Sequence, residues 1–298
     1  MPELPEVQTI VDDLNRKIKG DVIVGFWSDW LKSIKIARNG KVSLAASQNE
    51  VEKEIANRKI LQAWRIGKNM FIDLSGGKTI YIHLKMTGHL LIKKETESRK
   101  KKATKKDYFK DKVNQYIHHI WYLKSGITLE FSDLRKFAKI VLVDTDKIKD
   151  LAEIKKLGVD AMSPEFTLKK FKEILGKKSR APIGIVLMEQ ELIAGIGNIY
   201  RSEILFRAGI NPQRKISSLT AEEIKEIYKN IKKILKLAIK LRGTSDSDYR
   251  DSDGAPGNFQ KVLRVYNKEN EPCKKCGTII KRFKMGQRSV FHCPQCQK

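Results

Sequence analysis

The sequence predicts an α+β protein: a leading helix, a run of short antiparallel strands, a helical region and a cysteine-rich tail. Apolar residues recur with helical spacing before residue 20 and in short strand-like runs up to about residue 143. They return to helical spacing after about residue 151, and all four cysteines lie beyond residue 272. A chain of 298 residues can form two domains, each with its own core.

The first helix is expected over residues 7–18, with Gly20 as its C-cap. Its apolar residues fall on one helical face: Val7, Ile10, Val11, Leu14 and Ile18.

Strands are expected to follow, separated by turns such as Ser75–Gly77 and Lys124–Gly126. They are Val22–Trp27, Ile60–Trp64, Met70–Leu74, Thr79–Leu84, Ile117–Leu123, Ile127–Phe131 and Lys139–Val143. This pattern indicates an antiparallel sandwich or barrel. Lys93–Lys112, with ten Lys/Arg and four Asp/Glu, is expected to be a solvated loop, with a non-specific phosphate contact as the alternative.

Helical periodicity dominates the next region. Thr220–Glu223 has the pattern of a capping box that opens a helix through Leu241. An apolar stretch before it is broken by Gly195–Asn198, and a loop rich in Gly, Ser and Asp follows over Gly243–Gly257.

The cysteines form two Cys-x2-Cys pairs, Cys273/Cys276 and Cys293/Cys296, separated by 16 residues. This spacing predicts one structural zinc ion held by four thiolates, with two disulfides as the weaker alternative. The segment from Pro272 to Lys298 has seven Lys/Arg and no Asp/Glu, so the finger is expected to touch phosphate.

The net charge of +25 indicates a polyanionic partner, with nucleic acid ahead of anionic lipid; a lysine-rich proteome would explain part of the excess. No apolar run approaches the ~20 residues of a membrane span, and the N-terminus lacks a signal-peptide pattern. A cytoplasmic protein without a membrane partner is therefore expected.

Pro2 follows Met1 directly, and removal of the methionine would free a secondary amine. An α-amine titrates near ~7.7–8.0, so part of it is a neutral nucleophile at pH 7, able to form an iminium with a sugar C1′. Glu3 and Glu6 are close in sequence. The alternative is the ordinary preference of Pro and Glu for a first helical turn.

Several motifs together resemble the formamidopyrimidine-DNA glycosylase family across nearly the whole chain outside the lysine-rich stretch. They are Pro2–Val7, Gly67–Asn69, His83–Gly88, Asp133–Phe137, Gly195–Tyr200, Ser252–Gly257 and the four-cysteine finger.

The resemblance implies an N-terminal antiparallel β-sandwich with a leading helix (residues 1–148). A helical domain (149–262) follows, with a helix-two-turn-helix and a lesion-capping loop over Gly243–Gln260 that would hold the damaged base. A zinc finger (263–298) ends the chain. It implies that DNA lies between the sandwich and the helical domain. The expected partner is damaged double-stranded DNA, bound by a monomer that is nucleoid-associated when on DNA.

The resemblance also implies residue roles. Pro2 is the expected nucleophile, Glu3 the acid–base group and Lys68 a phosphate-contacting lysine that aids base loss, with Glu6 in support. Met86, Arg135 and Phe137 are expected to fill the space left by an extruded base. Asn198 and Arg288 are expected to bind phosphate, together with His118 or His119, between which the register does not decide.

The sequence also departs from the family pattern. Gly184 stands where a lysine is usual, Ser247 and Asn258 replace more typical basic and aromatic residues, and Ala138 replaces a common glycine. These changes leave lesion preference and opposite-base discrimination open.

The expected function is excision of oxidised purines (8-oxoguanine and formamidopyrimidines) with β,δ-elimination at the resulting site. Three alternatives remain. One is an endonuclease VIII-like enzyme for oxidised pyrimidines, another is a non-catalytic DNA-binding relative, and the last is an RNA-associated zinc-ribbon protein.

Overall fold

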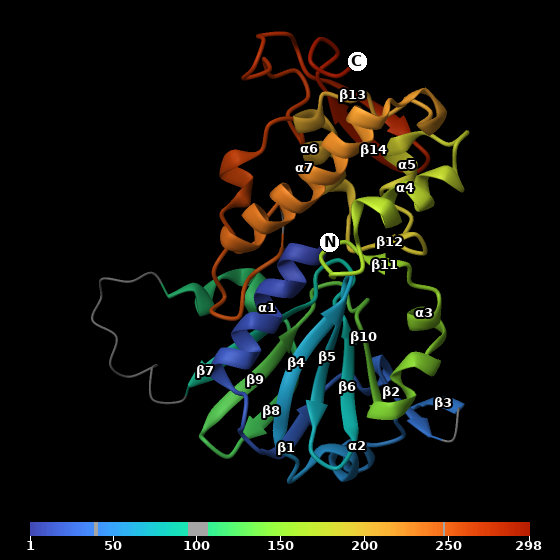
Figure 1. Cartoon of the computed structure of the whole chain (residues 1–298). Coiled ribbons are helices and arrows are strands. Elements are labelled where there is room, and N and C mark those ends of the chain that lie inside the picture. Colours follow the sequence, from blue (N-terminus) through green and yellow to red (C-terminus); the bar gives the residue numbers. More distant parts are fainter. Residues whose placement is uncertain (39–40, 95–106, 247) are drawn as a thin grey trace. The chain divides into compact units, whose positions relative to one another are not determined.

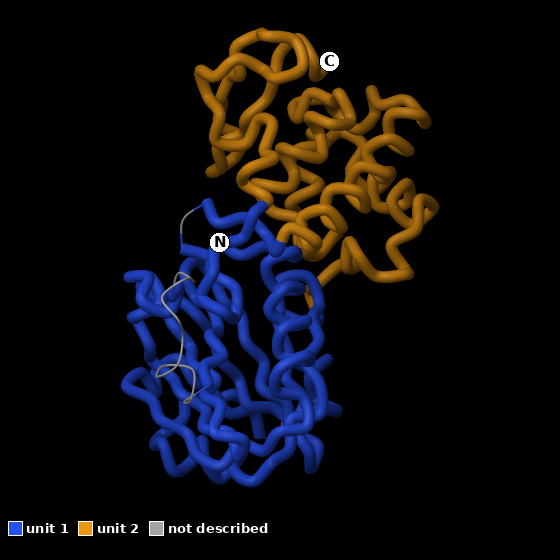
Figure 2. Tube along the Cα trace, turned by 90° about the vertical axis from the view of Figure 1, so that its left-hand side faces the viewer, with its two compact units in different colours: residues 1–155, 242–258 blue, residues 156–241, 259–298 orange. Residues whose placement is uncertain are grey.

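The computed structural model describes residues 1–38, 41–94, 107–246 and 248–298. The chain forms two compact units, which Figure 2 colours separately: residues 1–155 with 242–258, and residues 156–241 with 259–298. These bounds differ from the expected ones. Segment 242–258 belongs to the first unit although it follows the helical region in sequence, and the cysteine-rich tail shares a unit with the helices.

The first unit is built around two sheets, as Figure 1 shows. One sheet has the order β1-β8-β9-β7 and the other β3-β2-β10-β6-β5-β4. The strands are β1 (Ile23–Ser28), β2 (Ile34–Arg38), β3 (Lys41–Leu44), β4 (Ile60–Ile66), β5 (Asn69–Leu74), β6 (Lys78–His83), β7 (His89–Lys94), β8 (Ile117–Leu123), β9 (Ile127–Ser132) and β10 (Lys139–Asp144). The predicted fold class, an antiparallel sandwich rather than a barrel, is confirmed; the pair β2–β10 is parallel.

One core fills this unit, with apolar side chains from both sheets and from helix α1 (Leu4–Lys17). Helix α1 lies along β4, the edge strand of the six-stranded sheet. There the Asn15 amide bonds both backbone groups of Ala63, donating to its oxygen at 2.8 Å and accepting from its nitrogen at 2.8 Å. The helix thereby satisfies part of an edge that would otherwise be open. Two shorter helices complete the unit, α2 (Gln48–Ile55) and α3 (Ala152–Lys155).

The second unit is mainly helical. Its elements are β11 (Val159–Asp160), α4 (Leu168–Gly176), α5 (Ile183–Val186), β12 (Ile193–Ala194), α6 (Asn198–Ala208), α7 (Ala221–Lys240), β13 (Lys281–Met285) and β14 (Arg288–His292). The predicted capping box is present, because Thr220 accepts from the Glu223 backbone nitrogen and the Glu223 carboxylate accepts from the Thr220 nitrogen. Among the described residues, no helix combines the length and apolar character that a membrane crossing requires.

Candidate functional site

The N-terminal residues Pro2 and Glu3 are buried where α1 begins. Glu6, also buried, holds Glu3 in place because one of its carboxylate oxygens accepts from the Glu3 backbone nitrogen at 2.8 Å. The other oxygen accepts from the Thr244 backbone nitrogen at 2.7 Å. The Glu6 carboxylate thus joins Glu3, the residue after Pro2, to segment 242–258.

Lys68 lies in the two-residue turn between β4 and β5 and is 7% exposed. Gly67 takes a φ of +57°, and the Asn69 side chain closes the turn by donating to the Ile66 carbonyl at 3.1 Å. Burial lowers the pKa of the nearby His83 to about 4, with further contributions from the charges of Lys85 and Lys68. His83 is therefore neutral at pH 7, and its Nδ1 accepts from the Lys85 backbone nitrogen at 3.0 Å.

Met86, Arg135 and Phe137 come together on two neighbouring turns. The Arg135 guanidinium donates to the Met86 sulfur at 3.0 Å and lies 4.5 Å from the centre of the Phe137 ring. Met86 is 41% exposed and Phe137 53%. Both are apolar and face solvent, so neither is a core residue. This cluster has the apolar and cationic groups that filling a gap in stacked bases requires.

A buried carboxylate shapes one of these turns. Asp133 accepts from the backbone nitrogens of Arg135 at 3.2 Å, Phe137 at 2.9 Å and Ala138 at 2.9 Å, and from the hydroxyl of Thr87 on the other turn. Asp133 therefore holds the two turns together. Sequence reasoning did not single out this role; the signal was a lone Asp directly after a buried strand.

The two histidines are both buried, and they differ in the groups that engage their rings. His119 is fully buried, and Ser28 and Ser33 engage its two ring nitrogens at 2.8 and 2.9 Å. The geometry therefore disfavours the expected phosphate contact for His119. His118 is 7% exposed, with its Nδ1 2.8 Å from an Asp29 carboxylate oxygen.

In the second unit, Asn198 is the first residue of α6, directly after the Gly195–Gly197 turn. The guanidinium of Arg201, 1% exposed, donates to the Asn198 side chain, to the Gly184 carbonyl at 3.3 Å and to the Ser289 carbonyl at 3.2 Å. Ser289 follows the exposed Arg288 in β14. Arg201, which sequence reasoning missed, therefore fixes both predicted phosphate-binding positions within this unit.

Gly184 is buried in α5. A Cβ there would lie 2.9 Å from the Pro212 carbonyl oxygen and 3.1 Å from the Met285 sulfur. Packing therefore requires glycine where the family pattern has lysine.

The four cysteines Cys273, Cys276, Cys293 and Cys296 converge, with all sulfurs within 4.8 Å of one another. Sulfur separations of 3.9 Å (Cys273 to Cys296) and 3.5 Å (Cys276 to Cys293) match the about 3.8 Å edge of a tetrahedron with Zn–S bonds of about 2.3 Å. Disulfides at about 2.05 Å are excluded for these pairs. The finger holds one structural zinc ion.

Part of the lysine-rich stretch lies outside the described residues, namely 95–106, and so does Ser247. The described flanks are paired, since Lys93 bonds Glu130 at 2.5 Å and Asp111 accepts from Arg250 at 2.9 Å.

Family models match three stretches of the chain. They are the formamidopyrimidine-DNA glycosylase N-terminal domain (residues 1–140), the formamidopyrimidine-DNA glycosylase H2TH domain (157–249) and the zinc finger found in FPG and IleRS (270–298).

Individual proteins agree. The formamidopyrimidine-DNA glycosylase of Pelotomaculum thermopropionicum is 39% identical, over 100% of this chain and 99% of that protein. The Lactococcus lactis Fpg in complex with DNA containing an abasic site has a TM-score of 0.82 and 29% identity, over 99% of each chain. MutM in complex with DNA containing carbocyclic 8-oxo-G has a TM-score of 0.81 and 30% identity, over 100% of each chain. The chain belongs to the formamidopyrimidine-DNA glycosylase family.

Proposed function

We propose that this chain is a DNA glycosylase and AP lyase that excises oxidised purines from duplex DNA, with Pro2 as its nucleophile. The full-length family match carries the activity class, and solved relatives are bound to abasic and 8-oxo-G DNA. Pro2 directly precedes Glu3, the N-cap of α1, whose backbone nitrogen bonds to Glu6, and this position supports the assignment of the nucleophile.

The chemistry follows from the amine that Met1 removal frees. Its nitrogen bonds to the sugar C1′ as the bond from C1′ to the base breaks, and the base leaves with a proton. Glu3 supplies and accepts the protons that open the sugar ring. The resulting iminium acidifies the adjacent C2′–H, so that the 3′ and then the 5′ phosphate are eliminated and a one-nucleoside gap remains.

The surrounding residues take roles that fit their settings. Lys68, on its tight turn, is proposed to contact the phosphate beside the lesion. Met86, Arg135 and Phe137 are proposed to occupy the space of the extruded base, because they form one exposed cluster.

Asn198, Arg288 and His118 are proposed to bind backbone phosphates. The charge of +25 favours DNA association in general. We further propose that the protein acts as a monomer in base-excision repair in the cytoplasm, associated with the nucleoid when bound to DNA.

Borohydride trapping on a panel of duplexes tests this function. We expect a covalent protein–DNA adduct and excision on 8-oxoguanine and formamidopyrimidine duplexes. The adduct should disappear for Pro2→Gly and for protein that retains Met1.

Three other outcomes would change the assignment. A covalent adduct that still forms after both changes would indicate that the nucleophile is a lysine such as Lys68. Activity on thymine glycol alone would favour the endonuclease VIII-like alternative. Binding without any trap would indicate a non-catalytic DNA-binding relative, and preference for RNA over DNA in competition would indicate an RNA-associated protein.

A further inference from the structure

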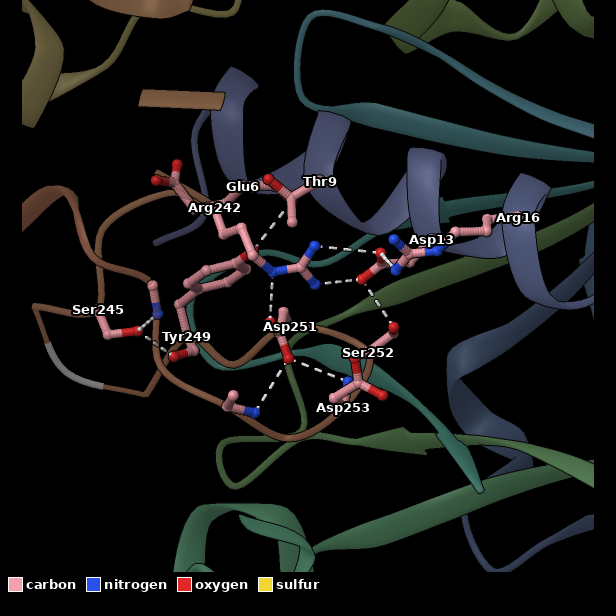
Figure 3. A network of polar contacts seen from close by, with 12 residues as sticks. Glu6, Thr9, Asp13, Arg16, Arg242, Ser245, Tyr249, Asp251, Ser252 and Asp253 are labelled. Atoms are coloured by element: carbon pink, nitrogen blue, oxygen red, sulfur yellow. Dashed lines mark hydrogen bonds and ion pairs between the residues drawn. The ribbon is translucent and has the colours of Figure 1, made fainter. Parts of the chain in front are cut away.

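Arg242, the second residue after helix α7, anchors the start of segment 242–258 to helix α1. Its backbone φ is +62°, a left-handed value that is uncommon for a side-chain-bearing residue. Its Nη1 and Nη2 donate to the two carboxylate oxygens of Asp13 at 3.2 and 2.5 Å, and its Nε donates to Asp251 at 2.7 Å. Figure 3 shows the guanidinium between these two carboxylates.

Further contacts extend this network along the helix. Ser252 donates to the Asp13 carboxylate at 2.7 Å, and Lys17 donates to both Ser252 and Asp253 at 2.7 Å. Asp13 is 1% exposed, Asp251 3% and Ser252 0%. Burial alone would raise the pKa of Asp13, but bonds from Arg242 and Ser252 outweigh it and lower the pKa. Asp13 is therefore an ionised carboxylate in the interior, and its partners are held tightly.

The three carboxylates of Asp13, Asp251 and Asp253 lie close enough to hold a cation. Arg242 and Lys17 already stand among them as counter-charges. The cluster is therefore an internal ion-pair network that joins two parts of the chain, and not a metal site.

Helix α1 also contacts the segment through Glu6, which lies on the same helix face as Asp13. Thr244 donates to Glu6, and a Cβ on Gly243 would lie 2.7 Å from a Glu6 carboxylate oxygen. Glu6 and Asp13 are seven residues apart, about two helical turns, so both point from one face of α1.

Other described residues of the segment are also held by hydrogen bonds. Ser252 accepts from the Ile92 backbone nitrogen at 2.9 Å, and Gly254 accepts from the Asn114 side chain at 3.0 Å. Ser245 closes the segment on itself, donating to the Tyr249 carbonyl at 2.6 Å and accepting from the Gly257 nitrogen at 3.0 Å.

We propose that Asp13 and Arg242 are positioning residues. Their ion pair fixes the described residues of segment 242–258 on helix α1 before DNA binds, so that the expected lesion-capping loop is pre-ordered beside the helix that follows Pro2. This inference rests on the proposed function. It predicts that the pair matters for removal of a damaged base and matters little for cleavage at an abasic site, which offers no base to hold.

The test compares Asp13→Asn with Arg16→Gln in the zinc-loaded, Met1-processed full chain. Arg16 is the matched control, because it pairs with the same Asp13 carboxylate at 2.5 Å but is 63% exposed and belongs to the helix, not to the segment. Single-turnover excision of 8-oxoguanine and cleavage of an abasic duplex are measured in parallel. Excision should fall on the order of tenfold to a hundredfold for Asp13→Asn, the loss typical of a misplaced binding group, while abasic cleavage changes less than about twofold.

Hydrogen exchange of residues 242–258 in the free protein gives a readout that does not depend on activity. Asp13→Asn should lose protection there and Arg16→Gln should keep it. If Asp13→Asn fails to fold, Arg242→Gln takes its place with the same expected pattern. Equal losses of excision and abasic cleavage, or unchanged exchange and excision, would overturn the inference. A wild-type protein inactive on both duplexes would instead refute the proposed function, and the exchange result would still report on the anchoring.

Discussion

Acidification should destabilise the β-sandwich through one buried histidine. His119 packs against the rings of Phe26, Trp30, Trp121 and Phe131, at centre-to-centre distances of 5.7 to 6.1 Å. Burial, with a smaller contribution from His118, lowers the pKa of His119 to about 3. An unfolded histidine titrates near ~6.5, so the stabilisation is fully present above that pH and is lost as the pH falls towards 3.

The size of the effect follows from this difference. Between about pH 7.5 and about pH 5 the unfolded chain gains nearly one proton at this position while the folded protein gains almost none, which lowers the free energy of unfolding by about 2 kcal/mol. The same proton uptake disappears when His119 is replaced by glutamine. Wild type should therefore lose about 2 kcal/mol more than His119→Gln between the two pH values.

Tryptophan fluorescence during denaturant unfolding measures this directly. All four tryptophans (Trp27, Trp30, Trp64 and Trp121) lie in the first unit, so the signal reports that unit and not the zinc finger. The two proteins share every other titrating group, and the difference between them isolates His119. Equal losses of unfolding free energy in both proteins would refute the reasoning, as would a His119 ring resonance that titrates near ~6.5 in the folded protein.

Three other perturbations have defined outcomes. Removing zinc with a chelator should release one equivalent of metal and unfold the β13–β14 hairpin, seen as new proteolysis within residues 270–298 and weaker DNA binding; an intact apo hairpin would contradict this. Asp133→Ala leaves the Phe137 and Ala138 nitrogens without their acceptor, while the Arg135 nitrogen keeps the Thr87 hydroxyl at 3.1 Å; it should lower the free energy of unfolding by roughly 2 kcal/mol and slow excision, and unchanged thermal unfolding would show that the turn holds without it. Gly184→Lys should cost about 1–3 kcal/mol of stability without improving excision of 8-oxoguanine; a stable variant with faster excision would show that α5 can accept the side chain.

The strongly patterned elements could be predicted from the sequence, but the long-range pairings could not. All seven expected strands exist, with ends shifted by at most two residues, and the first helix starts at Leu4 instead of residue 7. Strands β2, β3 and β7 were not predicted. β2 lies in the sheet interior because it pairs in parallel with β10, which is about 100 residues away. The local alternation of apolar and polar residues does not reveal such a distant pairing.

The candidate site shows the same division. The cysteine spacing predicted the metal centre, because its ligands are close in sequence and their chemistry is distinctive. Spacing could not show that Asp133 accepts from the nitrogens of the following turn, or that Arg201 on α6 donates to Ser289 in β14. A single Asp or Arg looks the same in sequence when it lies in a solvated loop. The family resemblance implied that segment 242–258 belongs with the helical region, whereas it lies in the first compact unit; its hydrogen bond from Arg242 to Asp13 joins residues 229 positions apart, which no local pattern shows.

The hydrogen bonds between the Asn15 amide and Ala63 also fix the number of residues between β4 and the N-terminal amine. The Asn15 amide bonds both backbone groups of Ala63 in β4. The helix therefore cannot shift along the strand without losing both hydrogen bonds. Each residue added to a helix moves its end by about 1.5 Å and turns it by about 100°. An insertion or deletion between Pro2 and Asn15 would therefore point the N-terminal amine in a new direction even if the helix stayed intact. Pro2 and Asn15 are thirteen positions apart, and this number sets where the N-terminal amine lies relative to β4. We expect the reaction to depend on this number more than on the identity of the solvent-facing residues in between.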